Sequence, residues 1–381
     1  APALERAFVA AWDDRLGWVT EGFLPAGDSY WPAHAVAIDG DVAVVSARYE
    51  DIDDVGNAGA VYVYRFSGAA WLFEARLTAP IPEQSAEFGT SLGVSGGWLL
   101  VGAPGADDHG LNSGAVYAFR FDGSAWVMSQ SVAPPLIEAQ DNFGASIDVD
   151  GASAVIGSRN ADGAEGHGVV DVFRRIAGAW VDEARLEAPT PIFTQLGNSS
   201  AIDGDVVVAG AQGQLMAAVW RRTDDVWSEA TVLTPPDPDV NGSFGFDVDV
   251  DGNTLAVTAE GGFFGDGAIV TYRWVDDSWA HQATLRDTRD DVNTAYFSRV
   301  VALQGTRLLG LNAGAVLTFD GLGLDCNANG VLDDCDVASG TSLDWNGNGV
   351  PDECEGIAAG DVNADGVVDA IDLLIILDAW G

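Results

Sequence analysis

Residues 88–117 read FGTSLGVSGGWLLVGAPGADDHGLNSGAVY, and this stretch decides the fold. The turn Val94-Ser95-Gly96-Gly97 lies between two apolar runs. A Ser-Gly pair between strands fits a tight hairpin, because Gly accepts a positive φ. The stretch opens with Phe88-Gly89 and closes with a strand-like Gly114-Ala115-Val116-Tyr117. It therefore predicts a β-hairpin followed by a third strand.

The same marks recur along the first 321 residues. An apolar-x-Gly-x turn occurs at residues 38–41, 94–97, 149–152, 202–205, 250–253 and 303–306. After each Gly-Ala-Val-Tyr-like strand a Trp opens the next strand, and Pro-rich connectors such as Ala133-Pro134-Pro135 close the unit. Each unit has about fifty residues and four short strands, the size of a propeller blade. Single blades cannot bury both faces, so the sequence predicts an all-β propeller of four-stranded blades.

The number of blades depends on the two ends of the repeat region. The last repeat, Phe297–Asp320, supplies three strands, and Trp18–Leu24 aligns with a fourth strand. We expect Trp18–Leu24 to complete the last blade, which gives six blades and leaves Ala7–Trp12 as a surplus strand. A ring of seven blades, two of them incomplete, is the alternative.

These motifs resemble those of a known family, the FG-GAP repeat propellers related to the head of the integrin α-subunit. The resemblance rests on Phe88-Gly89-Thr90-Ser91, on Val101-Gly102-Ala103-Pro104 and on Ser113-Gly114-Ala115-Val116-Tyr117. It covers most of residues 30–320, although the Gly-Ala-Pro element changes elsewhere, for example to Ile156-Gly157-Ser158. The resemblance implies a propeller with an interaction surface. Some blades of the integrin relatives bind calcium, but we assign no such loop here.

The charge of the chain disfavours two classes of partner. Its 58 acidic and 17 basic residues give a formal net charge of −41. A field of this sign repels nucleic acid and anionic lipid and attracts divalent cations. A surface adapted to high salt is the alternative explanation for the acids outside the C-terminal region. The longest apolar run, Ile371–Leu377, is too short to cross a membrane, so we expect no membrane insertion.

After Gly321 the composition changes to Asp, Asn, Gly and Cys, and three twelve-residue loops follow at EF-hand spacing. Such a loop offers calcium oxygen ligands at positions 1, 3, 5, 7, 9 and 12, with Gly at position 6 for the bend. The sequence therefore predicts Ca²⁺ as the bound metal. The predicted ligands, with the Val residues acting through their carbonyls, are Asp325, Asn327, Asn329, Val331, Asp333 and Asp336 in the first loop; Asp344, Asn346, Asn348, Val350, Asp352 and Glu355 in the second; and Asp361, Asn363, Asp365, Val367, Asp369 and Asp372 in the third.

All three Cys residues, Cys326, Cys335 and Cys354, lie within these loops. In a polar segment with no room for a core they are typical of cross-links in an oxidised, extracytoplasmic module, so we expect a secreted or cell-surface protein. Residues 322–356 resemble thrombospondin type 3 repeats. That resemblance implies a disulfide between neighbouring loops, which favours Cys335–Cys354, although the connectivity is not fixed by sequence.

Residues 357–381 resemble one half of a type I dockerin, in which a calcium loop precedes a short helix. A complete dockerin has two such repeats, and Ala370 and Ile371 lack the hydroxyls common in cohesin binders. A cohesin-like partner is therefore doubtful, and a structural calcium motif is the alternative. The expected organisation is a propeller over 1–321, thrombospondin-like repeats over 322–356 and a dockerin-like half-motif over 357–381.

The propeller sequence offers no catalytic constellation. Its four His residues fall in different repeats, and none has a Ser, Cys or carboxylate at a motif spacing. The stretch Asp247–Gly252 imitates half a calcium loop, but Leu255 and Thr258 replace the late ligands, so we interpret it as a half-buried strand entering an Asp-Gly turn. We likewise expect the repeated Trp residues to pack within and between blades. These features favour a non-enzymatic adhesion or interaction protein with a protein or polysaccharide ligand; an extracellular carbohydrate-active enzyme or a lectin is the alternative.

Overall fold

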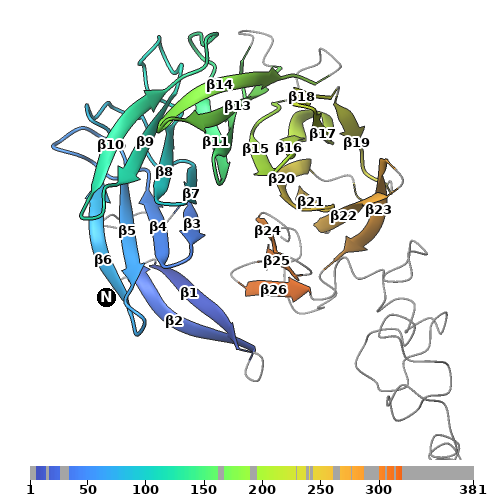
Figure 1. The fold of residues 1–381 in the computed structure, drawn as a ribbon, viewed down its shortest axis with the longest axis horizontal. Helices are drawn as coiled ribbons and strands as arrows, with labels where there is room; N and C mark the ends of the chain where they lie inside the picture. The colour runs from blue at the N-terminus through green and yellow to red at the C-terminus, as the bar shows by residue number, and fades with distance from the viewer. Residues whose placement is uncertain are drawn as a thin grey trace, which may run out of the picture.

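The computed structural model describes residues 6–13, 17–25, 34–161, 167–188, 195–228, 230–236, 240, 243–260, 267–275, 277–286, 300–304, 307–312 and 315–319. Strands dominate this part of the chain, and a short 3₁₀ turn, η2 (Gln212–Gln214), lies between two of them. The sheets follow one another around a common centre, with the first strand of each sheet toward the middle (Figure 1). The predicted all-β propeller of four-stranded blades is confirmed. No helix among the described residues has the length and apolar character needed to span a membrane.

Each blade is an antiparallel meander in which consecutive strands are neighbours. Blade 1 contains β3 (Val36–Asp39), β4 (Val42–Ala47), β5 (Ala60–Phe66) and β6 (Trp71–Leu77). Blade 2 contains β7 (Leu92–Ser95), β8 (Trp98–Ala103), β9 (Ala115–Phe121) and β10 (Trp126–Val132). Blade 3 contains β11 (Phe143–Asp150), β12 (Ser153–Ser158), β13 (Val169–Ile176) and β14 (Ala179–Leu186).

The later sheets vary this plan. Blade 4 contains β15 (Ser199–Asp203), β16 (Val206–Ala211) and β17 (Met216–Thr223), and its outer edge is divided into β18 (Val226–Trp227) and β19 (Thr231–Leu233). Blade 5 contains β20 (Ser243–Asp251), β21 (Thr254–Glu260), β22 (Ala268–Val275) and β23 (Ser278–Leu285). A three-stranded sheet of β24 (Val301–Gln304), β25 (Arg307–Asn312) and β26 (Ala315–Phe319) follows.

The N-terminal strands differ from the expectation. β1 (Arg6–Asp13) and β2 (Gly17–Pro25) pair with each other along their whole length, from Arg6 opposite Pro25 to Asp13 opposite Gly17. The expected pairing of Trp18–Leu24 with the last sheet is not formed among the described strands, which make seven sheets, two of them with fewer than four strands. The physical reason is local: two long strands joined by a short connection satisfy each other's backbone groups. The expectation that Trp18–Leu24 completes the last blade, on which the count of six blades was based, is therefore wrong: this segment pairs with β1.

The apolar core lies between neighbouring blades. One buried cluster joins Val42, Val44 and Val63 of blade 1 to Leu99 and Val101 of blade 2, and similar clusters join the blades that follow. The Phe of the repeated Phe-Gly pair belongs to these clusters: the buried residues at this place are Phe88, Phe143, Leu196 and Phe244. The repeat therefore specifies the packing of one blade on the next as well as the strands within a blade.

Candidate functional site

The first strands of the six larger sheets line a cavity of about 760 Å³ at the centre of the ring, here called the central cavity. Its lining alternates small and branched apolar residues with hydroxyls, and it includes three carboxylates. These carboxylates belong to Asp148 of β11 and to Asp247 and Asp249 of β20. A central cavity with convergent polar groups is the usual first candidate for a binding or active site.

Each of these carboxylates holds the neighbouring sheet. Asp148 Oδ2 accepts a hydrogen bond from the backbone N–H of Ile202 in blade 4 at 2.8 Å. Asp249 Oδ2 accepts from the N–H of Leu303 in β24 at 2.6 Å. The second oxygen of each carboxylate accepts from the N–H of the next residue in its own strand. Both oxygens are thus occupied by backbone donors.

Asp247 is used in a similar way. Its Oδ1 accepts from the Ser199 hydroxyl at 2.5 Å, and its Oδ2 accepts from the backbone N–H of Val301 at 2.9 Å. Three successive sheets are therefore tied together by this one side chain and the hydroxyl that it contacts. A partly buried carboxylate that accepts two such bonds from fixed donors is held in place by them.

Burial raises the pKa of all three carboxylates. For Asp249, burial, assisted by the negative charge of Asp148, raises the pKa to about 8. A shift of this kind occurs in active sites and also in structural hydrogen-bond networks. Here every oxygen is taken by the fold, which favours the structural explanation.

One end of the central cavity carries basic residues. His34, Arg48 and Arg159 line it there, in a chain with few basic side chains. Burial and the neighbouring charge of Arg48 lower the pKa of His34 to about 4, so its imidazole is neutral near pH 7. Arg48 donates from Nη2 to the Tyr49 hydroxyl and lies 3.4 Å from a Glu87 carboxylate oxygen through Nη1.

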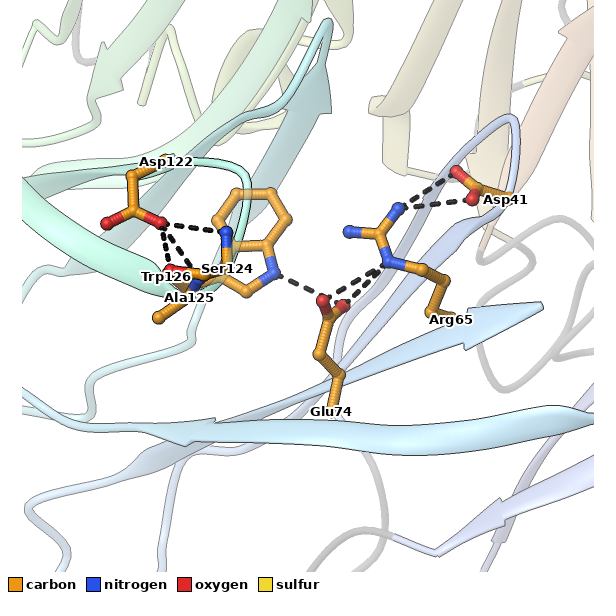
Figure 2. A network of polar contacts seen from close by, with 7 residues as sticks. All are labelled: Asp41, Arg65, Glu74, Asp122, Ser124, Ala125 and Trp126. Carbon is orange, nitrogen blue, oxygen red and sulfur yellow. Dashed lines mark hydrogen bonds and ion pairs between the residues drawn. The ribbon is translucent and has the colours of Figure 1, made fainter. Parts of the chain in front are cut away.

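The outer strands carry a second group of polar contacts. Glu74 of β6 accepts from Arg65 Nε at 3.2 Å and from the indole N–H of Trp126 in blade 2 at 3.4 Å (Figure 2). Arg65 also pairs with Asp41 and lies over the ring of Phe121, 4.6 Å from its centroid. One carboxylate thus joins an Arg of its own blade to a Trp of the next.

The contact recurs between blades 3 and 4. Glu183 of β14 accepts from Arg174 Nε at 2.8 Å, from Arg222 Nη1 at 2.8 Å and from the indole N–H of Trp227 at 3.1 Å. The predicted role of these Trp residues in inter-blade packing is therefore confirmed for Trp126 and Trp227. Sequence reasoning missed the two Glu residues; the signal was available, since each stands three residues after the Trp that opens its strand.

The interpretation of Asp247–Gly252 as strand and turn is confirmed, because Ser243–Asp251 is β20. Every predicted calcium ligand, from Asp325 to Asp372, lies outside the described residues, as do the three Cys residues. Within the described part of the chain, no group of three or more His, Cys, Asp or Glu side chains is arranged to hold a metal ion.

The carboxylates of the central cavity were also missed as a group. A pattern was present in the sequence: Asp-Val-Asp-Gly occurs at 148–151 and again at 249–252. The first Asp of each copy lies in the central cavity, and the second enters the turn.

Comparisons with known proteins agree with this fold. Residues 31–64 and 71–119 match the model of the FG-GAP repeat family. No curated protein matches the chain. A protein of Bacteroides uniformis described as a candidate 6-phosphogluconolactonase superposes with a TM-score of 0.51 at 13% identity, over 75% of this chain and 80% of its own.

Two further solved structures are similar. A functionally unknown protein of Desulfotomaculum acetoxidans gives a TM-score of 0.52 at 9% identity, over 83% of this chain and 92% of its own. A protein of Lactobacillus plantarum gives 0.50 at 16% identity, over 74% and 79%. At such identities the similarity shows the fold and carries no activity over to this chain.

Proposed function

We propose that this chain is a secreted or cell-surface, calcium-binding interaction protein whose propeller binds a protein or polysaccharide without chemical turnover. One observation carries the non-enzymatic part: Asp148, Asp247 and Asp249 give all their carboxylate oxygens to hydrogen bonds that hold the sheets together. A general acid or base must be able to exchange its proton with a substrate in reach. These side chains are instead engaged by backbone and hydroxyl donors.

The calcium part of the proposal rests on the three acidic loops after Gly321, each with Gly at position 6 and an acid at position 12. We propose that Ca²⁺ shapes this segment as a thrombospondin-like stalk ending in a dockerin-like half-motif, and that Cys335 pairs with Cys354. The ion then contributes stability and spacing, while recognition belongs to the propeller.

A carbohydrate-active enzyme is the competing hypothesis, and a single experiment separates the two. The full chain is screened for binding to a panel of polysaccharides in the presence of Ca²⁺, with released reducing ends measured in the same wells. Retention on a polysaccharide with no new reducing ends supports the proposal. New reducing ends released by the wild-type chain would instead refute the non-enzymatic part of the proposal.

A further inference from the structure

The N-terminal pair of strands has the register of the outer half of a blade. β1 and β2 pair from Ala7 opposite Leu24 to Trp12 opposite Trp18, with one bulge along the way. The third and fourth strands of blade 1, β5 and β6, pair in the same register, with the Leu and the Trp of the fourth strand at the same steps and the bulge in the same place. Within the described part of the chain, β1 pairs with no strand on its other edge. β1 and β2 therefore correspond to the third and fourth strands of a seventh blade.

The first strand of blade 1 is exposed on the side where the inner half of this seventh blade would lie. Val36 and Ile38 of β3 are 65% and 58% exposed, and both line the central cavity. In the five sheets that follow, each residue at these two places packs against the preceding blade and is at most 9% exposed. These residues are Leu92, Val94, Ile147, Val149, Ser200, Ile202, Val248, Val250, Val301 and Leu303. Blade 1 thus presents an apolar strand that its neighbours cover in every other case.

The other surfaces around this place agree. β1 and β2 lie farther from the centre of the ring than β3 and β24 (Figure 1), and Leu24 packs on Tyr62 and Tyr64 of β5, so the pair covers the outer part of blade 1. In the last sheet, Leu309 of β25 is partly exposed. Its equivalents on the side that faces the next blade are fully buried: Val44, Leu100, Val155, Val208 and Ala256. We call the space bounded by β1, β3 and β25 the open slot.

Two backbone donors at the open slot have no side-chain acceptor. Asp148 and Asp150 of blade 3 accept hydrogen bonds from two N–H groups of the first hairpin in blade 4. The turn Gly of blades 2, 3 and 5 donates in the same way to an Asp or Ser in the turn of the preceding blade. The equivalent N–H groups of blade 1 are those of Ile38 and Gly40, and no side chain among the described residues accepts from either. A preceding hairpin with Asp at these two places would satisfy both donors.

We propose that the open slot binds a β-hairpin of a partner protein, which completes the seventh blade by strand addition. One strand of the hairpin pairs with the free edge of β1, as second strands pair with third strands in the other blades, and its apolar side chains cover Val36 and Ile38. Its Asp residues accept from Ile38 and Gly40. The partner hairpin therefore has the pattern apolar-Asp-apolar-Asp-Gly, which residues 147–151 show in blade 3.

This inference rests on the proposed binding function and names a protein as the ligand at this surface. A polysaccharide has no backbone amide groups to pair with a strand edge, and it lacks branched apolar side chains to cover the exposed face of β3. A hairpin supplies both, together with the carboxylates.

The test titrates the full-length protein into a fluorescently labelled synthetic peptide of residues 143–158 and follows the anisotropy. This peptide contains β11, its Asp-Gly turn and β12, the hairpin that provides Asp148 and Asp150 to blade 4. We expect saturable binding. The Asp150→Ala peptide should bind at least about tenfold more weakly, because a charge-assisted hydrogen bond is worth at least this factor. No binding of the unchanged peptide, or equal binding of the two peptides, would overturn the proposal.

A matched pair of protein variants locates the binding. Ile38→Lys places an ammonium on the apolar face of the open slot, and Leu72→Lys makes the same change on β6 at a residue that is 57% exposed, against 58% for Ile38. Because both side chains are exposed, neither change should lower the melting temperature. Ile38→Lys is expected to weaken peptide binding at least about tenfold, since the ammonium would be buried without a partner, and Leu72→Lys is expected to leave it unchanged. Equal binding by Ile38→Lys and the wild type would refute the site.

Other occupants of the open slot give other results. A second copy of this chain would appear as a concentration-dependent dimer that Ile38→Lys dissociates. A segment of the chain itself would keep the peptide out, and Ile38→Lys would then lower the melting temperature while Leu72→Lys would not. Either result would overturn the partner hairpin.

The open slot and the proposed binding function can fail separately. If the peptide does not bind and a polysaccharide is retained, the slot is wrong and the binding function stands. If the peptide binds and the chain releases reducing ends from a polysaccharide, the slot stands and the non-enzymatic function is wrong.

Discussion

The glycine of the Gly-Ala-Pro element offers a direct test of how one blade meets the next. Gly157 in β12 lies against the Phe-Gly-type loop of blade 4, and a Cβ added to it would lie 2.0 Å from the carbonyl oxygen of Gly197 and 2.4 Å from Ser146 Oγ. The same contact recurs at Gly102, whose added Cβ would lie 2.2 Å from the carbonyl oxygen of Gly144. We therefore expect Gly157→Ala to separate blades 3 and 4 locally.

The expected loss of unfolding free energy in Gly157→Ala follows from the groups that the added Cβ would displace. Overpacking costs about 1–3 kcal/mol, and the upper end applies because the obstacle is backbone and not a flexible side chain. The hydrogen bond from Ser146 Oγ to the Gly197 carbonyl, 2.9 Å long, is displaced as well, at about 1 kcal/mol. The expected loss of unfolding free energy is therefore about 4 kcal/mol.

The matched control separates this contact from backbone strain. Gly151 has φ +55° with nothing within 4 Å of an added Cβ, so Gly151→Ala costs only the left-handed conformation, about 1–2 kcal/mol. Urea unfolding followed by tryptophan fluorescence measures both variants against the wild type. The reasoning is refuted if Gly157→Ala is no less stable than Gly151→Ala.

Three further outcomes are expected. Glu183→Ala should lose about 2–3 kcal/mol of unfolding free energy in urea at pH 7, because Arg222 is left without one of its carboxylates, whereas the exposed Glu187→Ala should change little. Burial acts to raise the pKa of Glu183, but the hydrogen bonds from Arg222, Trp227 and Arg174 lower it overall. The contribution of Glu183 is therefore present above pH about 4.3 and is lost as the pH falls through its folded pKa. The pKa of Asp249 is about 8 in the folded state against about 3.9 unfolded, so the melting temperature should fall as the pH rises from 5 to 8, and Asp249→Ala should show a flatter profile; an unchanged slope in the variant contradicts this. Calorimetric titration of the full chain should show about three Ca²⁺ sites that prefer Ca²⁺ to Mg²⁺, and no heat of binding contradicts the loop assignment.

The fold could be predicted from the sequence because its signals are local and repeated. A Gly in the turn and a Phe before Gly recur at nearly fixed spacing, and each serves one blade and its neighbour. The turn Gly residues do have positive φ, for example +55° at Gly40 and +56° at Gly96. The buried side chain of Phe88 packs between blades 1 and 2, as the repeat required.

The features that the sequence analysis did not predict depend on which strands pair and in which register. β1 and β2 have no sequence mark that decides between pairing with each other and pairing with the last sheet, and loop closure favours the nearer partner. The bulge positions of Glu74 and Glu183 are also invisible to a strict alternation pattern, because the extra residue shifts the register within the strand. They become predictable only when several blades are aligned on their Trp and Leu residues.

The acidic composition acquires a partial structural explanation from the turns themselves. The side chain of Asp39 accepts a hydrogen bond from the backbone N–H of Gly96 in the next blade at 2.7 Å. Asp150 accepts from Gly204 at 2.9 Å, and Asp203 accepts from Gly252. In the Asp-Gly turns of blades 3 and 4, the Gly forms the hairpin of its own blade and donates its N–H to the blade before it. The Asp of the same turn accepts a hydrogen bond from the blade that follows. Where Ser95 replaces Asp, its hydroxyl still accepts from Gly151, but at 3.2 Å and without the charge. These acids are therefore part of how blades hold one another, and adaptation to salt is not needed to explain them.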